Sequence, residues 1–258
     1  MTTGDKAVDR LGRSLRLLWR VGERSKPGPK PTFTLEGIVD AAISVADNEG
    51  IDALGMRRVA DELGSGAMSL YRYVPSKTEL LNLMLDRVHA PTEELAHASG
   101  GTWRELTEAH ARQSWRRYLA HPWLLQVNWS RPVLGPNMVA DFDASLAALD
   151  GLDLDGVDRV MIGNVVDGYV TGLARSYVFS QDASRDSGIS DQQYQDYLVP
   201  FLEAAVATGE YPAVAALPDD QAWGVSWHQT FDFGLERLLD GLERYIEGKA
   251  SGSGDQPE

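Results

Sequence analysis

The sequence of 258 residues contains no cysteine. Disulfide bridges, cysteine-ligated zinc sites and thiol nucleophiles are therefore excluded, and the absence suits a reducing compartment such as the cytoplasm. Also missing are any run of about twenty consecutive apolar residues and, at the N-terminus, the apolar segment and cleavage site of a secretory signal. These absences favour a soluble protein that remains in the cytoplasm.

Positive charge is scarce as well, since the formal net charge is −14. Such an excess of acid argues against nucleic-acid binding, in which Lys and Arg neutralise phosphates. The charge is unevenly distributed, however. Residues 1–90 carry 13 Lys and Arg against 12 Asp and Glu, whereas residues 91–258 carry 11 against 26, and residues 1–31 alone carry 8 against 3. The sequence therefore predicts a basic arm, a near-neutral module and an acidic body.

The sequence also predicts no β-strand, because no segment shows the convincing apolar–polar alternation of a half-buried strand. Apolar residues instead recur at spacings of three and four, which is typical of amphipathic helices. The predicted fold class is therefore all-α. Capping residues, glycines and prolines place four short helices early in the chain, at 34–49, 56–63, 66–73 and 76–89. The last of them is expected to start with a capping box formed by Ser76 and Glu79.

Longer helices follow beyond residue 100. Capping boxes at Thr102 and Ser190, and Pro136 in a first turn, mark three of the starts. The predicted helices are at about 102–121, 136–149, 155–179 and 219–247, with one more that starts at Ser190 and contains Pro200. Residues 180–190 are polar and predict a loop, and the Gly/Ser/acidic segment 249–258 predicts a disordered tail.

Residues 55–77 have the arrangement of a helix-turn-helix. An amphipathic helix from Met56 ends at Gly64, which readily takes a left-handed conformation, and a second short helix follows. In such motifs the second helix enters the major groove of DNA. If Leu70 and Val74 face the core, the helical period turns a set of other side chains outward. These outward positions are Ala67, Ser69, Arg72 and Tyr73.

The segment Leu-Tyr-Arg-Tyr-Val-Pro-Ser-Lys-Thr-Glu-Leu-Leu at 70–81 resembles the DNA-binding module of the TetR family, and the resemblance covers residues 34–89. It implies a three-helix DNA-binding module. By this resemblance Thr34 and Arg57 would contact the DNA backbone or a base edge, and Tyr71 and Lys77 would hold phosphates. The residues that would face bases are Ala67, Met68, Ser69, Arg72 and Tyr73.

One departure and one alternative bear on this interpretation. Residues 66–68 offer no Asn or Gln side chain for bidentate contact with adenine, so sequence preference would depend on Arg57, Arg72, hydroxyls and apolar contacts. The alternative is that residues 55–77 are ordinary helices of an all-α core. A helix that only packs in a core would not need the dense polar and aromatic edge from Tyr71 to Lys77.

The acidic C-terminal half resembles, more loosely, the ligand-binding half of tetracycline-repressor-like members of the family, through 121–123, 131–136 and 231–242. Effector pockets are mostly aromatic and apolar, with a few polar groups that orient the ligand. The candidate lining residues are Trp103, His110, Trp115, Trp123, Asn128, Trp129, Arg131 and Met138. The tryptophans equally fit a hydrophobic core.

Polar residues at helical positions that should be buried are a further clue, since an unpaired buried polar group costs about 1–3 kcal/mol. Asn164, Asp167 and His228 are such positions. We expect each of these side chains to pair within the subunit or across a dimer rather than to contact a ligand. Asn164 and Asp167 nevertheless join the candidate pocket.

The resemblance also implies a dimer formed through two late helices of each subunit. Gly168 and Gly172 would permit close backbone approach, and an apolar seam would lie on the last helix. The seam residues are Leu235, Leu238, Leu239 and Leu242. The alternative is that these residues pack only within one subunit.

The N-terminal arm contains a potential basic helix at residues 7–21, with an apolar stripe among many arginines. The stripe consists of Val8, Leu11, Leu15 and Leu18. Basic arms can follow the DNA backbone or minor groove beside a binding site. Docking of the stripe onto the body and disorder without DNA are the alternatives.

The sequence thus predicts a DNA-binding module joined to a larger helical domain for ligand binding and dimerisation. The expected parts are an arm at 1–31, a DNA-binding domain at 32–78, an effector and dimerisation domain at 79–248, and a tail. The expected function is a homodimeric repressor that a small-molecule effector releases from a palindromic operator in double-stranded DNA. A constitutive DNA binder and a helical enzyme are the alternatives, and no cofactor, metal site or membrane contact is expected.

Overall fold

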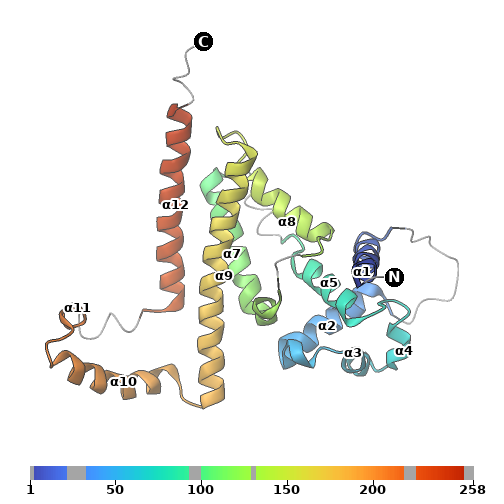
Figure 1. The fold of residues 1–258 in the computed structure, drawn as a ribbon, viewed down its shortest axis with the longest axis horizontal. Coiled ribbons are helices and arrows are strands. Elements are labelled where there is room, and N and C mark those ends of the chain that lie inside the picture. Colours follow the sequence, from blue (N-terminus) through green and yellow to red (C-terminus); the bar gives the residue numbers. More distant parts are fainter. Residues whose placement is uncertain (1–2, 22–32, 93–99, 129–131, 218–224, 253–258) are drawn as a thin grey trace, which may run out of the picture. The chain divides into compact units, whose positions relative to one another are not determined.

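A computed structural model describes residues 3–21, 33–92, 100–128, 132–217 and 225–252. Every regular element in these residues is a helix, so the predicted all-α class is confirmed (Figure 1). The chain forms two compact units, residues 1–163 and 164–258. None of the described helices combines the length and apolar character needed to cross a membrane.

Five short helical elements form the part of the first unit that carries the helix-turn-helix. They are α2 (Leu35–Glu49), the 3-10 helix η1 (Ile51–Ala53), α3 (Met56–Glu62), α4 (Ala67–Leu70) and α5 (Lys77–Val88). Their apolar faces meet in one core, which holds α3 and α4 in place. Its fully buried members include Ile38, Leu70, Val74, Leu80 and Met84, and burial of each such side chain contributes roughly 1.5–3 kcal/mol.

The starts of α2 and α5 follow the predicted capping residues. Thr34 Oγ1 accepts a hydrogen bond from Gly37 N at 3.0 Å, and Ser76 Oγ accepts one from Thr78 N at 3.2 Å. The capping box predicted at Ser76 is incomplete. The buried Glu79 carboxylate bonds the Ser76 hydroxyl instead of the Ser76 backbone N–H, because the side chain is drawn into the core beside α1.

The rest of the first unit contains α7 (Trp103–Ala120), the 3-10 helix η2 (Pro122–Gln126) and α8 (Pro136–Ala147). The capping box at Thr102 and the proline in the first turn of α8 are both present as predicted. The element η2 was not predicted. It places Trp123 and Leu124 in the same core as α2 and α5.

Helix α1 (Thr3–Leu18) packs against α5. Ser14 is buried and accepts a hydrogen bond from Asn82 Nδ2 at 3.1 Å. Trp19 Nε1 donates to the backbone oxygen of Leu134 at 3.1 Å. For residues 3–21, docking onto the body is therefore the alternative that the structure shows.

The docking alternative used the apolar stripe of α1, and most of that stripe is exposed in the structure. Of its members only Leu18 is buried, whereas Val8, Leu11 and Leu15 are exposed. Helix α1 turns its Ser14 side toward α5, since the hydroxyl gains a partner there and a small side chain allows close approach. The remainder of the predicted arm, 22–31, lies outside the described residues.

The second unit begins within α9 (Gly156–Ser187) and continues with α10 (Asp191–Val206), α11 (Pro212–Ala215) and α12 (Trp227–Gly252). Helix α9 buries a four-residue repeat, and α12 supplies a facing stripe. The buried residues are Val166, Val170, Ala174 and Val178 on α9, and Phe231, Leu235, Leu239 and Ile246 on α12. The Tyr169 hydroxyl joins the helices, lying 3.0 and 2.9 Å from the backbone oxygens of Thr230 and Phe231.

The loop predicted at 180–190 is wrong for its first eight residues, which continue α9. Polar side chains do not by themselves break a helix, and the first glycine after them is Gly188, with φ +66°. The capping box predicted at Ser190 follows directly and is complete, with Gln193 as its second member.

The boundaries predicted for the last helix also need correction. Helix α12 begins at Trp227, where Ser226 and Gln229 exchange the two hydrogen bonds of a capping box that the sequence interpretation overlooked. It ends at Gly252, so the tail predicted from 249 is helical over its first four residues. The predicted segments at 219–224 and 253–258 lie outside the described residues.

Candidate nucleic-acid interface and effector region

The turn between α3 and α4 has the predicted geometry. Gly64 has φ +62°, a conformation that costs glycine little because it has no Cβ. Helix α4 is shorter than the predicted 66–73, since Pro75 disfavours helical backbone at Val74. The chain still turns beyond α4, with Val74 N donating to Leu70 O at 2.9 Å.

The exposed surface of this segment differs in part from expectation. Leu70 and Val74 are completely buried, as predicted. The side chains that are most exposed are Met68, Tyr71 and Arg72, with Met68 79% exposed. The half-buried ones are Ala67, Ser69 and Tyr73. The outward surface thus consists of a long apolar chain, an aromatic ring and a guanidinium, rather than mainly of small residues.

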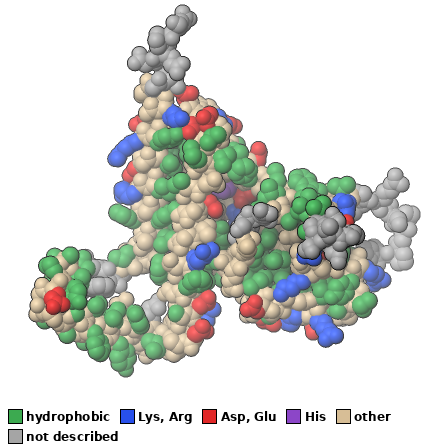
Figure 2. Space-filling model, in the orientation of Figure 1, with side chains coloured by type: hydrophobic (Ala, Val, Ile, Leu, Met, Phe, Trp, Pro, Cys, Tyr) green, Lys and Arg blue, Asp and Glu red, His purple; other side chains and the backbone are tan. Residues whose placement is uncertain are grey.

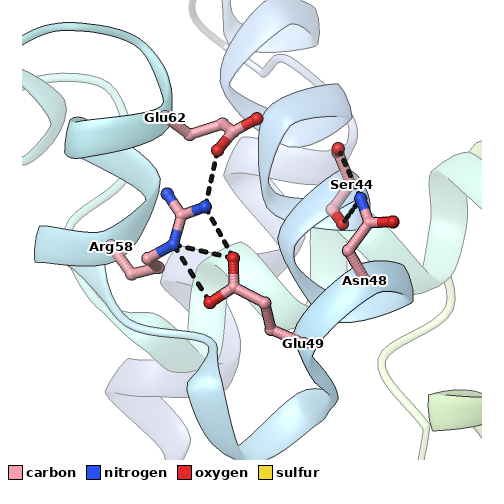
Figure 3. Close-up of polar contacts among 5 residues, drawn as sticks. All are labelled: Ser44, Asn48, Glu49, Arg58 and Glu62. Carbon is pink, nitrogen blue, oxygen red and sulfur yellow. Dashed lines mark hydrogen bonds and ion pairs between the residues drawn. The ribbon is translucent and has the colours of Figure 1, made fainter.

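Two adjacent arginines of α3 have different environments. Arg58 Nη2 donates to Glu49 at 2.6 Å and to Glu62 at 2.7 Å, and Arg58 Nε donates to Glu49 at 2.9 Å (Figure 3). The hydrogen bond from Arg58 holds the pKa of the Glu49 carboxyl below its ordinary value. Arg57 is exposed and forms no ion pair with any described residue. Arg58 therefore ties α3 to α2, and Arg57 is available to a ligand.

Thr34 and Lys77, the other predicted phosphate or backbone contacts, stand at the starts of α2 and α5 and are both exposed. The Thr34 oxygen already accepts the N–H of Gly37, which leaves its hydroxyl hydrogen to donate. Lys77 is the first residue of α5, where the helix dipole adds to the charge of the ammonium group. Both positions are suited to an anionic partner.

Among the described residues, the predicted effector residues of the first unit lie in different environments. Trp123 and Met138 belong to the hydrophobic core, and Trp123 Nε1 donates to Asp47 at 2.7 Å. On α7, Trp115 is buried and Trp103 and His110 are half-buried. Asn128 is exposed, and Trp129 and Arg131 lie outside the described residues.

Three polar residues that were expected to be buried, Asn164, Asp167 and His228, are exposed. The buried repeat of α9 runs through Val166 and Val170, so the positions of Asn164 and Asp167 fall beside it rather than on it. Within one subunit these side chains are therefore not buried, and their pairing across a dimer stays a prediction.

A polar cluster lies among α5, α7 and α8, and of its members the sequence predicted only His110 as a candidate effector residue. Arg117 Nη1 donates to Asp141 Oδ2 at 2.7 Å, and His110 Nδ1 lies 3.8 Å from Asp141 Oδ1. Burial, reinforced by the charge of Arg117, lowers the pKa of His89 to about 4. We call His89, His110, Arg117 and Asp141 the Arg117 cluster. The seven-residue spacing of His110 and Arg117, two helical turns, is the signal that predicts their common face.

Asp86 connects α5 to the start of α8. Its carboxylate accepts hydrogen bonds from the backbone N–H groups of Asn137 and Met138, each at 3.0 Å, and from Asn137 Nδ2 at 3.1 Å. Burial raises the pKa of the Asp86 carboxyl, and these hydrogen bonds oppose the rise. A side chain from one helix thus satisfies the free N–H groups of another.

The residues predicted at a dimer interface are only partly exposed. Leu235 is buried within the chain, and Leu238 and Leu242 are half-buried. Gly168 and Gly172 are exposed, and a Cβ atom added at either would meet nothing within 4 Å.

Two family models match the chain. The model for bacterial regulatory proteins of the tetR family matches residues 38–84, which include the helix-turn-helix. The model for the tetracyclin repressor-like C-terminal domain matches residues 95–246. Together they cover both the DNA-binding module and most of the acidic body.

Curated relatives and solved structures agree with these matches. The HTH-type transcriptional repressor DrrR1 of Streptomyces coeruleorubidus is 48% identical over 90% of this chain and 86% of its own length. An HTH-type transcriptional regulator of Saccharopolyspora erythraea is 34% identical over 94% and 97%.

Among solved structures, apo ActR from Streptomyces coelicolor is 28% identical, with a TM-score of 0.66 over 87% of this chain and 100% of its own. ActR in complex with actinorhodin is similar, with 28% identity and a TM-score of 0.67 over 83% and 97%. The resemblance recognised in residues 34–89 is therefore confirmed. The chain belongs to the tetR family of bacterial regulatory proteins and is a DNA-binding transcriptional regulator.

Proposed function

We propose that this regulator is a homodimeric repressor that leaves a palindromic operator when a small-molecule effector binds to its C-terminal half. The observation that carries the proposal is the exposed pair Tyr71 and Arg72, held outward by the completely buried Leu70 and Val74. In this proposal the arm at 1–31 precedes a DNA-binding domain at 32–78, and residues 79–248 bind the effector and form the dimer.

We assign the DNA contacts according to chemistry. Arg57 and Arg72 donate to base edges or phosphates, because a guanidinium matches both geometrically. Thr34, Tyr71 and Lys77 bind phosphates and set the register of the module on the duplex. The contacts nearest the bases are assigned to Ala67, Met68, Ser69 and Tyr73.

Dimerisation is assigned to the late helices, with Gly168 and Gly172 on α9 and Leu238 and Leu242 on α12. Exposed apolar side chains support this choice, because large exposed apolar patches mark interaction surfaces. They include Val165, Phe179 and Phe233 on α9 and α12, and Tyr194, Tyr197 and Phe201 on α10, where Figure 2 shows hydrophobic side chains gathered over the helix. Two copies would bind two half-sites about one helical turn of DNA apart.

Effector binding is assigned by similarity to ActR, which has been crystallised with actinorhodin and with (S)-DNPA. A repressor without an effector remains the alternative within the same family. Catalysis is not proposed, because the relatives of this chain are transcriptional regulators. We place the protein in the cytoplasm, where its DNA would be.

The experiment is an unbiased selection of DNA fragments that bind the full chain, followed by a screen for compounds that release the selected fragment. A palindromic site, a dimer in the complex and affinity that falls steeply with salt are expected, since each neutralised phosphate releases counterions. Absence of any selected fragment would contradict the DNA-binding assignment. Release by no compound in a broad screen would favour the constitutive alternative.

The matched variants are Arg72→Ala with Lys77→Ala, and Arg116→Ala as the control. The first pair should lower operator affinity at least tenfold, because each lost ionic contact is worth about 1–3 kcal/mol. Arg116 is exposed on α7, outside the assigned DNA-binding domain, and its loss should leave affinity unchanged. Circular dichroism must show that the variants are folded.

A further inference from the structure

Helix α7 has an unusual buried surface. Its buried residues are Thr107, Ala111, Gln113, Ser114, Trp115 and Arg117, and four of these six are polar. A helix that only fills a core buries mainly apolar side chains, because each polar group must find a partner there. The composition of this surface therefore favours a binding site over simple packing.

Arg117 is the most informative member. Its side chain is 7% exposed, and Nη1 pairs with Asp141 at 2.7 Å. Its other terminal nitrogen, Nη2, is buried and has no hydrogen-bond partner among the described residues. A donor of this kind is costly to bury, so a group that accepts from it would be bound strongly.

The histidine beside it offers complementary chemistry. His89 Nδ1 lies 2.6 Å from the backbone oxygen of Leu85, and since a carbonyl only accepts, Nδ1 carries the proton. With its pKa lowered to about 4, the ring is neutral at pH 7, and Nε2 is an acceptor. The Arg117 cluster thus combines a buried donor with a neutral ring, and its one carboxylate, Asp141, is paired with Arg117.

We propose that the Arg117 cluster binds the anionic oxygen of the effector, which is an organic acid with a carboxylate or phenolate group on an apolar body. This inference rests on the proposed function and names the effector class. Arg117 Nη2 donates to that oxygen, while Asp141 holds the guanidinium in place.

The position of the cluster connects such a ligand to DNA binding. His89 caps the C-terminal end of α5, whose first residue is Lys77, an assigned phosphate contact. A helix of 12 residues is about 18 Å long. A ligand that contacts the end of α5 can therefore shift the other end, provided that it binds the two arrangements with different affinity.

The test compares 2-naphthoate with 2-naphthamide, two probes of similar shape that differ in charge, by calorimetric titration of the full chain at neutral pH. We expect naphthoate to bind one site per chain at least tenfold more tightly, as the loss of a charge-assisted hydrogen bond implies. Equal affinities for the two probes would overturn the proposal, and so would saturable binding of neither.

Three variants locate the site. Arg117→Gln combined with Asp141→Asn replaces the ion pair by an amide pair of similar volume, and it should bind naphthoate no better than naphthamide. Arg117→Lys keeps a cation for Asp141 but removes the second donor arm, and it should lose the preference too. Arg116→Gln, on the exposed side of the same helix, should retain it. Retention of the preference in both Arg117 variants would refute the site.

The same variants separate this inference from the proposed function. Without ligand, Arg117→Gln with Asp141→Asn should bind the selected operator with wild-type affinity, since neither residue is an assigned DNA contact. If an effector releases the operator equally well from both Arg117 variants, the site is wrong although the repressor assignment stands. If the wild type binds no operator, the repressor assignment fails whatever naphthoate does.

Discussion

The Asp86 carboxylate on α5 accepts the backbone N–H of Met138 on α8 at 3.0 Å. The two residues are 52 positions apart, so the first turn of α8 is satisfied by tertiary contact and not by a local capping residue. The contact fastens α8, which carries Asp141, to the helix that begins with Lys77.

Asp86→Ala should lower the free energy of unfolding by about 1–3 kcal/mol, because it leaves the N–H groups of Asn137 and Met138 without an acceptor. Urea denaturation measures the change. Asp40→Ala is the control, since Asp40 is an exposed carboxylate that pairs with Arg87, and such pairs contribute about 1 kcal/mol or less. Equal effects of the two substitutions would contradict the tertiary cap.

Gly135→Ala should destabilise the same junction. A Cβ atom at Gly135 would lie 2.3 Å from Asp86 Oδ1, so the carboxylate would have to leave its position. Thermal unfolding should show a lower midpoint, and the effect should shrink when Asp86 is already Ala, because the two changes disturb one contact. Gly156→Ala is the control, since a Cβ atom there meets nothing within 4 Å. Additive effects in the double variant would count against a shared contact.

Arg57 and Arg58 should respond in opposite ways to replacement by alanine. Arg57→Ala should weaken operator binding and leave thermal stability unchanged, because the side chain is exposed and has no described ion-pair partner. Arg58→Ala should lower thermal stability, because it removes the contacts to Glu49 and Glu62 (Figure 3). Band-shift titration and thermal unfolding of both variants test the assignment. A loss of stability in Arg57→Ala with none in Arg58→Ala would reverse these roles.

Acid should destabilise the protein through His89. Its pKa is lowered to about 4 in the folded chain, against about 6.5 when unfolded, so between these values the unfolded chain binds the additional proton. Stability is therefore lost as the pH falls from 6.5 toward 4, by at most about 3 kcal/mol from this group. Arg117 and His110 disfavour the charged ring, and Asp141 favours it.

The measurement is urea denaturation at several pH values between 7.5 and 4.5, for the wild type and for His89→Gln. The variant cannot titrate at this position, so its stability should fall less steeply over that range. Parallel curves for the two proteins would show that the imidazole does not carry the effect.

The elements whose causes are local could be predicted from the sequence. The left-handed turn at Gly64 and the capping boxes at Thr102 and Ser190 each involve residues a few positions apart, and all are found where the sequence predicts them. The segment from Leu70 to Leu81 likewise identified the DNA-binding module. Local hydrogen bonds and backbone preferences are sufficient for such features.

Contacts between side chains far apart in the sequence could not be predicted, because they depend on how the helices pack. The Arg117–Asp141 pair, the capping of α8 by Asp86 and the docking of α1 through Ser14 and Asn82 join residues 24, 52 and 68 positions apart. Helical periodicity predicts that a face is buried but not what it packs against. For this reason helical spacing did not show that Asn164 and Asp167 are exposed within one subunit. It also missed Arg117, because a sequence pattern assigns a charged residue to solvent.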